Sequence, residues 1–190
     1  MIKGIQGFNE AQAITGEINS LPAGKYICRV IDLIQKLSKN GNPMIELHFD
    51  INEGPFKDFY MKKFKRDQNT NVNVKYQGVY HQLMMGNSLP YYKGMIESIK
   101  ASNIGLDHID FSKDWDETKL KGKLFGILMG RKEIMTNSGN KIFITVPKAI
   151  RNIHELEYCK IPEDELLPSS KIDNMSQNIT YNVNDDDLPF

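Results

Sequence analysis

Apolar and polar residues alternate along the first part of the chain in a way that is typical of β-strands. KYICRVIDLIQKL at 25–37 is rich in Ile and Val and contains neither Gly nor Pro. SKNGNP at 38–43 contains an Asn-Gly pair, which is a strong hairpin signal. MIELHFDI at 44–51 then places every second residue on one apolar face: Ile45, Leu47, Phe49 and Ile51. The pattern predicts two antiparallel strands joined by a tight turn.

The pattern continues through a second turn, NEGPF, and then changes. KDFYMKKF at 57–64 alternates again and is predicted as a third strand, whereas the polar, Asn-rich 66–88 is predicted as a long loop with little regular structure at its start. SLPYYKGMIESIKASN at 88–103 has helical spacing, with a serine at the cap position and an early proline. Its apolar stripe consists of Tyr92, Met95, Ile96 and Ile99. A second hairpin is predicted from strands at 122–135 and 140–150.

Three strands, a helix and two strands follow one another in the order of an OB-fold, a small and partly open five-stranded barrel. We therefore expect a mainly β protein with an OB-fold-like barrel and one helix between the third and fourth strands. SH3-like barrels and small sandwiches are the alternatives. We divide the chain into a lead-in at 1–20, the barrel domain at 21–160, and a polar tail at 161–190 that is predicted to be disordered.

The formal net charge of zero hides an asymmetry between these segments. Residues 1–160 hold 23 basic and 17 acidic residues, a charge of +6, while 161–190 hold one basic and seven acidic residues, a charge of −6. A basic body with an acidic tail favours an anionic ligand for the body, and a separate partner or a self-competing role for the tail. A tail that only aids solubility is the alternative.

Sequence signatures of catalysis are missing. The four histidines stand singly, the cysteines form no metal-binding pair, and no phosphate-cradling loop or nucleophile motif occurs. We expect a protein that is not an enzyme and that uses no cofactor and no metal. A metal-dependent nuclease is the catalytic alternative, although a solvated turn is the preferred interpretation of the acids it would use: Asp107, Asp110, Asp114, Asp116 and Glu117.

The sequence also bears on the cellular compartment. No apolar run is long enough to span a membrane, and the N-terminus lacks the apolar core and cleavage site of a secretion signal. Cys28 and Cys159 stand far apart, as is typical of reduced intracellular thiols. We expect a cytoplasmic protein without a membrane partner.

Basic residues interleave with aromatic ones, which is how single-strand binders hold phosphates and stack bases. Tyr60 beside Lys62 in the predicted third strand is the best stacking candidate, and Phe143 beside Lys141 is the second. The candidate DNA-binding residues are Lys36, Lys39, Tyr60, Lys62, Lys63, Lys65, Arg66, Tyr76, Tyr80, Arg131, Lys132, Lys141 and Phe143. For any single residue, a core aromatic or a solvated lysine is at least as good an interpretation. The set is stronger because its basic cluster falls on a strand that binds nucleic acid in this fold.

The ending DDDLPF at 185–190 resembles the C-terminal tip of bacterial and phage single-stranded DNA-binding proteins, typically Asp-Asp-Asp-Ile-Pro-Phe. The body also resembles a family of phage proteins from Gram-positive hosts, encoded among replication and recombination genes. The residues that carry this likeness, over most of 20–150, are LPAGKYICRVID, SKNGNPMIELHFDI, NEG, SNIG and LKGKLFGILMGRKE. The barrel of the common bacterial protein is not closely similar, so the number of subunits stays open and a homo-oligomer is one option.

The resemblance implies a sequence-tolerant single-stranded DNA-binding protein of phage replication or recombination, in the cytoplasm of a bacterial host. It also implies that the tip docks on replication or recombination proteins of phage or host. The chemistry agrees, because an apolar pocket would take the last residues and a basic rim would take the acids. The implied docking residues are Asp185, Asp186, Asp187, Leu188, Pro189 and Phe190. A non-catalytic protein-interaction scaffold is the remaining alternative.

Overall fold

The computed structural model describes residues 20–69 and 72–168. Within these residues, five strands form one antiparallel sheet in the order β3-β2-β1-β4-β5. The strands are β1 (Gly24–Leu37), β2 (Pro43–Ile51), β3 (Val79–Leu83), β4 (Leu124–Met135) and β5 (Lys141–Arg151). Around them lie α1 (Phe59–Gln68), α2 (Leu89–Ala101) and three short 3-10 turns, η1 (Gly86–Ser88), η2 (Glu117–Leu120) and η3 (Leu156–Tyr158).

Both predicted hairpins are confirmed. They lie side by side, because β1 of the first hairpin pairs with β4 of the second in the middle of the sheet. β1 pairs with β2 from Cys28↔Ile51 to Leu37↔Pro43, and with β4 from Gly24↔Met129 to Arg29↔Leu124. The predicted apolar face of β2 is confirmed as core, with its four side chains at most 4% exposed. Removing this face from water is the main driving force that holds the sheet against the rest of the chain.

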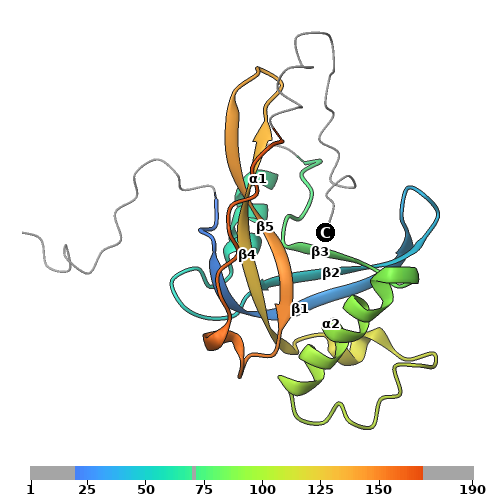
Figure 1. The fold of residues 1–190 in the computed structure, drawn as a ribbon. Helices are drawn as coiled ribbons and strands as arrows, with labels where there is room; N and C mark the ends of the chain where they lie inside the picture. The colour runs from blue at the N-terminus through green and yellow to red at the C-terminus, as the bar shows by residue number, and fades with distance from the viewer. Residues whose placement is uncertain (1–19, 70–71, 169–190) are drawn as a thin grey trace, which may run out of the picture.

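The sheet is open rather than closed into a barrel. β3 and β5 are its two edges, and among the described residues no ladder joins them. Figure 1 shows the β4–β5 hairpin projecting upward and the β1–β2 hairpin projecting to the right, with α2 below the latter. The predicted helix is confirmed as α2, because Met95, Ile96 and Ile99 are buried at its inner face. Neither α-helix in the described part of the chain has the length and apolar character that crossing a membrane requires.

The predicted third strand at 57–64 is wrong, because most of this segment belongs to α1. Asp50 near the end of β2 is fully buried, and its carboxylate accepts hydrogen bonds from the backbone N–H groups of Tyr60 and Met61, both at 3.0 Å. These donors belong to the first turn of the helix, where they have no partner within the helix itself. Asp58 stands at the usual cap position but makes no side-chain cap and pairs with Arg29 instead. The sheet therefore caps and positions α1.

The third strand of the fold is β3, which lies inside the segment that was predicted as a loop. β3 pairs with β2 from Met44↔Leu83 to His48↔Val79. Just before β3, the backbone at Gly78 lies very close to the backbone of β2. A Cβ atom at Gly78 would lie only 2.2 Å from the carbonyl oxygen of Phe49. The Phe49 N–H donates to the Gly78 carbonyl at 2.7 Å. Glycine at this position thus allows the two backbones to meet where β3 begins.

The described part of the predicted disordered tail is ordered. Residues 162–167, which we call the acidic strap, follow η3 and run beside β4 (Figure 1). Glu165 forms a parallel bridge with Lys132, and the Leu167 N–H donates to the Glu133 carboxylate at 3.1 Å. The prediction of disorder from residue 161 is therefore wrong for the strap. The rest of the tail and the lead-in, 169–190 and 1–19, lie outside the described residues.

Candidate nucleic-acid interface

The β4–β5 hairpin holds a guanidinium group against an exposed aromatic ring. Arg131 lies opposite Thr145, and Glu133 lies opposite Phe143, so Arg131 and Phe143 share one face of the hairpin. The guanidinium carbon of Arg131 is 5.0 Å from the centre of the Phe143 ring, within the range of a cation–π interaction. Phe143 is 41% exposed, which is unusual for a phenylalanine in a strand. The structure thus brings together two residues that the sequence nominated.

Two further candidates lie on opposite faces of this hairpin. Lys141 is exposed and lies two residues before Phe143 in β5, so the two side chains share a face and Lys141 extends the Arg131–Phe143 surface. Lys132 lies opposite Ile144 on the other face, and its ammonium group is 3.1 Å from the Glu165 carboxylate of the acidic strap. Lys141 is therefore open to solvent, whereas Lys132 is engaged within the chain.

The two candidate lysines of the β1–β2 hairpin, Lys36 and Lys39, differ in exposure. Lys39 is exposed in the turn between the strands. Lys36 is half-buried, and its ammonium group pairs with the Glu46 carboxylate on the neighbouring strand. The charge of Lys36 is compensated locally. Lys39 is the more exposed of the two candidates.

A polar cluster that the sequence reasoning missed lies on the outer face of β1, β2 and β3. The Glu46 carboxylate is 2.6 Å from His48 Nε2 and 3.0 Å from His81 Nε2, in addition to its contact with Lys36. Burial alone would raise the pKa of Glu46, but hydrogen bonds from Lys36 and the two histidines outweigh it and lower that pKa to about 2. Histidines that stand singly in the sequence meet because Glu46 and His81 are cross-strand partners. The sequence shows that Glu46 and His48 lie on the same polar face of β2. It does not show that His81 joins them, because β3 was predicted as a loop.

The candidate tyrosines differ sharply in exposure. Tyr60 is 7% exposed and packs edge-on against Phe49, with ring centres 5.3 Å apart. Tyr80 is 9% exposed. Both rings belong to the core cluster and offer no open face for a base to stack on, so the structure gives no support to their predicted role in binding. Tyr76 is half-buried, donates its hydroxyl to the Phe49 carbonyl at 2.9 Å, and stacks on the His48 ring with centres 5.8 Å apart.

The basic cluster around Lys62 lies on α1 and not on a strand, which corrects the placement that supported it. Lys62 and Lys65 are exposed, while Lys63 and Arg66 each contact Asp67 at 3.3 Å. A shallow hollow of about 290 Å³ opens here, lined by Pro55, Phe56, Lys57, Phe59, Lys62, Lys63 and Arg66. The cluster therefore offers positive charge, but the nearby rings of Phe56 and Phe59, which line the hollow, are half-buried.

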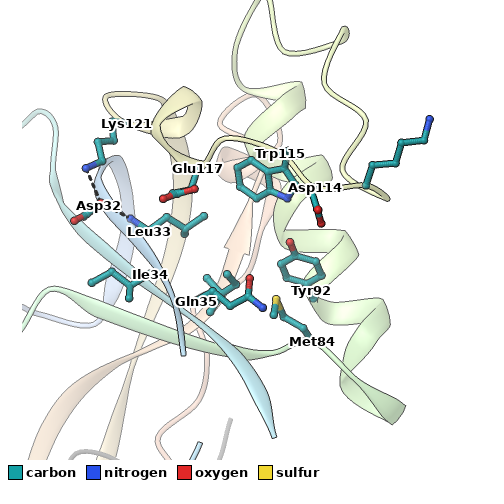
Figure 2. Close-up of a pocket in the computed structure, with 12 residues that line it drawn as sticks. Asp32, Leu33, Ile34, Gln35, Met84, Tyr92, Asp114, Trp115, Glu117 and Lys121 are labelled. Atoms are coloured by element: carbon teal, nitrogen blue, oxygen red, sulfur yellow. Dashed lines mark hydrogen bonds and ion pairs between the residues drawn. The ribbon is translucent and has the colours of Figure 1, made fainter. Parts of the chain in front are cut away.

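A larger groove of about 630 Å³ lies between β1 and the α2 side of the molecule (Figure 2). Trp115, Tyr92 and Met84 line one side, and Leu33 and Gln35 line the other. The charged residues of the lining are Asp32, Asp114, Glu117, Lys113 and Lys121. Because the acids outnumber the lysines, this groove suits phosphates less well than the β4–β5 hairpin does.

Two of the five acids of the nuclease alternative, Asp110 and Asp116, are hydrogen-bonded within their own turns. Asp110 Oδ1 accepts hydrogen bonds from the N–H and hydroxyl of Ser112, and Asp116 Oδ1 accepts the same pair from Thr118. These bonds lower the pKa of both carboxyl groups. Among the residues that the structure describes, no three His, Cys, Asp or Glu side chains gather in a way that could hold a metal ion. The geometry adds nothing in favour of a nuclease.

The implied docking tip, Asp185–Phe190, lies outside the described residues, and its role stays a prediction. No protein-family model and no curated protein matches this chain. The case for a function therefore rests on the residues themselves and on the geometry of the hairpins.

Proposed function

We propose that this protein is a sequence-tolerant single-stranded DNA-binding protein of the OB-fold type, which acts without catalysis in phage DNA replication or recombination. The strand order supports this proposal: a central β1 flanked by β2 and β4, with β3 and β5 outermost, is the order expected of an OB-type barrel that is open between its third and fifth strands. Barrels of this type contact oligonucleotides through strands two and three and through the loops of the two hairpins.

The Arg131–Phe143 pair on the β4–β5 hairpin carries this proposal. A base can stack on a ring that is 41% exposed, and the adjacent guanidinium can pair with a phosphate. Stacking tolerates any base, since every base has a π face. Lys141 on the same face and Lys39 on the other hairpin would contact further phosphates of the strand.

A titration of fluorescent oligo-dT, and of the same strand in a duplex, at several salt concentrations tests the proposal. We expect tighter binding to the single strand, with a logarithmic affinity that falls linearly with the logarithm of the salt concentration. Equal affinity for the two forms, or an affinity that ignores salt, contradicts it. Light scattering on the same samples gives the number of subunits.

The alternatives give different outcomes in companion assays. Cleavage of labelled single strands in the presence of Mg²⁺ or Mn²⁺ would favour a nuclease. Complete absence of binding at low salt would favour a protein-interaction scaffold.

We also propose that the tip recruits replication or recombination proteins. Deletion of Asp185–Phe190 is expected to abolish capture of such a partner while oligo-dT affinity stays the same or rises, because competing negative charge is removed. A lower oligo-dT affinity after this deletion would refute competition by the tip.

A further inference from the structure

The acidic strap occupies an edge of β4 that β1 leaves uncovered. β1 pairs with β4 only as far as Met129, so the backbone beyond that residue lacks a ladder partner on this side. The Glu133 N–H donates to the Glu165 carbonyl at 2.8 Å, and the Glu165 N–H donates to the Arg131 carbonyl at 2.9 Å. The strap thus adds a short parallel strand to β4, the mode by which an extended peptide binds a sheet edge.

Two acids of the strap neutralise three cations of the β4–β5 hairpin. Asp164 accepts hydrogen bonds from the Arg131 guanidinium through both carboxylate oxygens, one of them from Nε at 2.9 Å. Glu165 pairs with Lys148 and with Lys132. Hydrogen bonds from Arg131 lower the pKa of Asp164, and those from Lys148 and Lys132 lower the pKa of Glu165. The carboxylates are thus charged where a phosphate chain could lie.

The strap fits closely against β4 but is held mainly at the surface. A Cβ atom at Gly130 would lie 3.1 Å from Pro162 Cβ and 3.0 Å from Lys148 Cγ, so glycine makes room for both. In contrast, residues 163–166 are exposed. Lys132 and Lys148 are half-buried, but Arg131 and the two strap carboxylates lie at the surface, where ion pairs are screened by salt and another polyanion can replace them.

We propose that Arg131, Lys132 and Lys148, which reach the strap-covered edge of β4 from its two faces, form a phosphate-binding track for single-stranded nucleic acid, and that the acidic strap occupies this track in the free protein. The inference rests on the proposed function, because Arg131 of the track also contacts Phe143. A strand that stacks on Phe143 brings a phosphate to Arg131, whose guanidinium cannot keep its two-oxygen contact with Asp164 at the same time. Nucleic-acid binding and strap docking therefore weaken each other by the same factor.

The first test compares oligo-dT affinities of the full chain and of the Asp164→Asn, Glu165→Gln double variant. We expect the variant to bind about fivefold tighter or more, because its strap no longer competes for the cations. The matched control is Asp114→Asn with Glu117→Gln, which removes the same two charges from exposed side chains of the groove. Thermal melts of both variants confirm that they are folded.

The second test measures amide hydrogen exchange at Glu133 and Glu165 in the wild-type chain. Both N–H groups are hydrogen-bonded between strap and β4, so we expect slow exchange in the free protein and faster exchange when oligo-dT is added. Unchanged or slower exchange with oligo-dT bound would overturn displacement of the strap.

The third test isolates Lys148. In the Asp164→Asn, Glu165→Gln background, Lys148→Gln is expected to lower oligo-dT affinity and to reduce the salt slope by about one, as loss of one phosphate contact requires. An unchanged slope removes Lys148 from the track. If wild-type chain binds no oligo-dT, the proposed function and the track fail together. If it binds but the double variant binds no tighter than its control, the track alone fails.

Discussion

Two segments of this chain, α1 and the β4–β5 hairpin, interleave basic and aromatic residues. The fold buries the aromatic ring in the first and leaves it exposed in the second. In α1, Tyr60 is 7% exposed, whereas Lys62 is exposed and donates its ammonium group to the Lys57 carbonyl. In the β4–β5 hairpin, Phe143 is 41% exposed, and Arg131 lies against its ring. What lies beneath each segment explains the difference. α1 covers the core at Phe49, whereas the end of the hairpin projects past the body (Figure 1).

Interleaved basic and aromatic residues indicate a binding surface only where no core lies beneath the aromatic ring. An aromatic ring with a core beneath it is drawn into that core by the hydrophobic effect, and only the lysines stay outside. A ring on a projecting hairpin has no core beneath it, so Phe143 stays partly exposed even with Arg131 against it. The lysines of α1 and the ring of Phe143 should therefore respond differently to mutation.

Tyr60→Ala should have the largest effect of the four changes, and this effect should be on stability. We expect the free energy of unfolding to fall by about 3 kcal/mol, because the ring packs between Phe49 and Phe59 at centre distances of 5.3 and 5.2 Å. Urea denaturation measures this. Tyr91→Ala, at a tyrosine 72% exposed on α2, is the control and should stay within about 0.5 kcal/mol. Equal effects of the two changes would contradict a core role for Tyr60.

Asp50→Ala tests whether the sheet holds α1 in place. It removes the acceptor of three backbone N–H groups, at Ile51, Tyr60 and Met61, and should cost about 2 kcal/mol together with some helical circular dichroism. Asp58→Asn is the control, because the Asp58 side chain makes no cap. If the control lost as much stability, capping by Asp50 would not be the reason for this helix.

Phe143→Ala should act on binding instead of stability. We expect oligo-dT affinity to fall about tenfold, the loss of one stacked base, while the free energy of unfolding changes by less than about 0.5 kcal/mol. Ile142→Ala is a close control, since its side chain is 43% exposed and alternates to the opposite face of β5. Similar losses of affinity in both variants would show that the ring is not a specific contact.

Replacing Lys62 and Lys65 together by Gln should have the smallest effect. Both lysines are exposed on α1 without an open ring beside them, so we expect oligo-dT affinity to fall by less than about threefold at moderate salt. Lys141→Gln on the hairpin is the comparison. A loss from the α1 pair that equals the loss from Phe143→Ala would reverse the assignment and make α1 the principal surface.

Much of the fold is predictable because its long elements carry their own signals. β1, β2, β4, β5 and α2 each show a local period and end at turn residues. α1 is not predictable in this way. Tyr60 and Phe64 are four residues apart, a spacing that puts them on one face of either a strand or a helix. The choice is made by Asp50, a residue of β2.

The site is predictable only in part, for the same reason. Alternation in β5 places Phe143 and Lys141 on one face, and the sequence shows that directly. Lys148 and the histidines around Glu46 depend on contacts between distant segments. β3 is five residues long and depends on Gly78, and the acidic strap has too few apolar residues to signal order by itself.

The acidic strap covers the edge of β4, and this coverage also affects the tendency of the protein to aggregate at high concentration. An open strand edge offers unpaired N–H and C=O groups to the next molecule and is a common starting point for aggregation. The strap closes that edge from Arg131 to Glu133 in each molecule. A segment that supplies none of the buried core side chains in the described chain thus protects the projecting β4–β5 hairpin against edge-to-edge association.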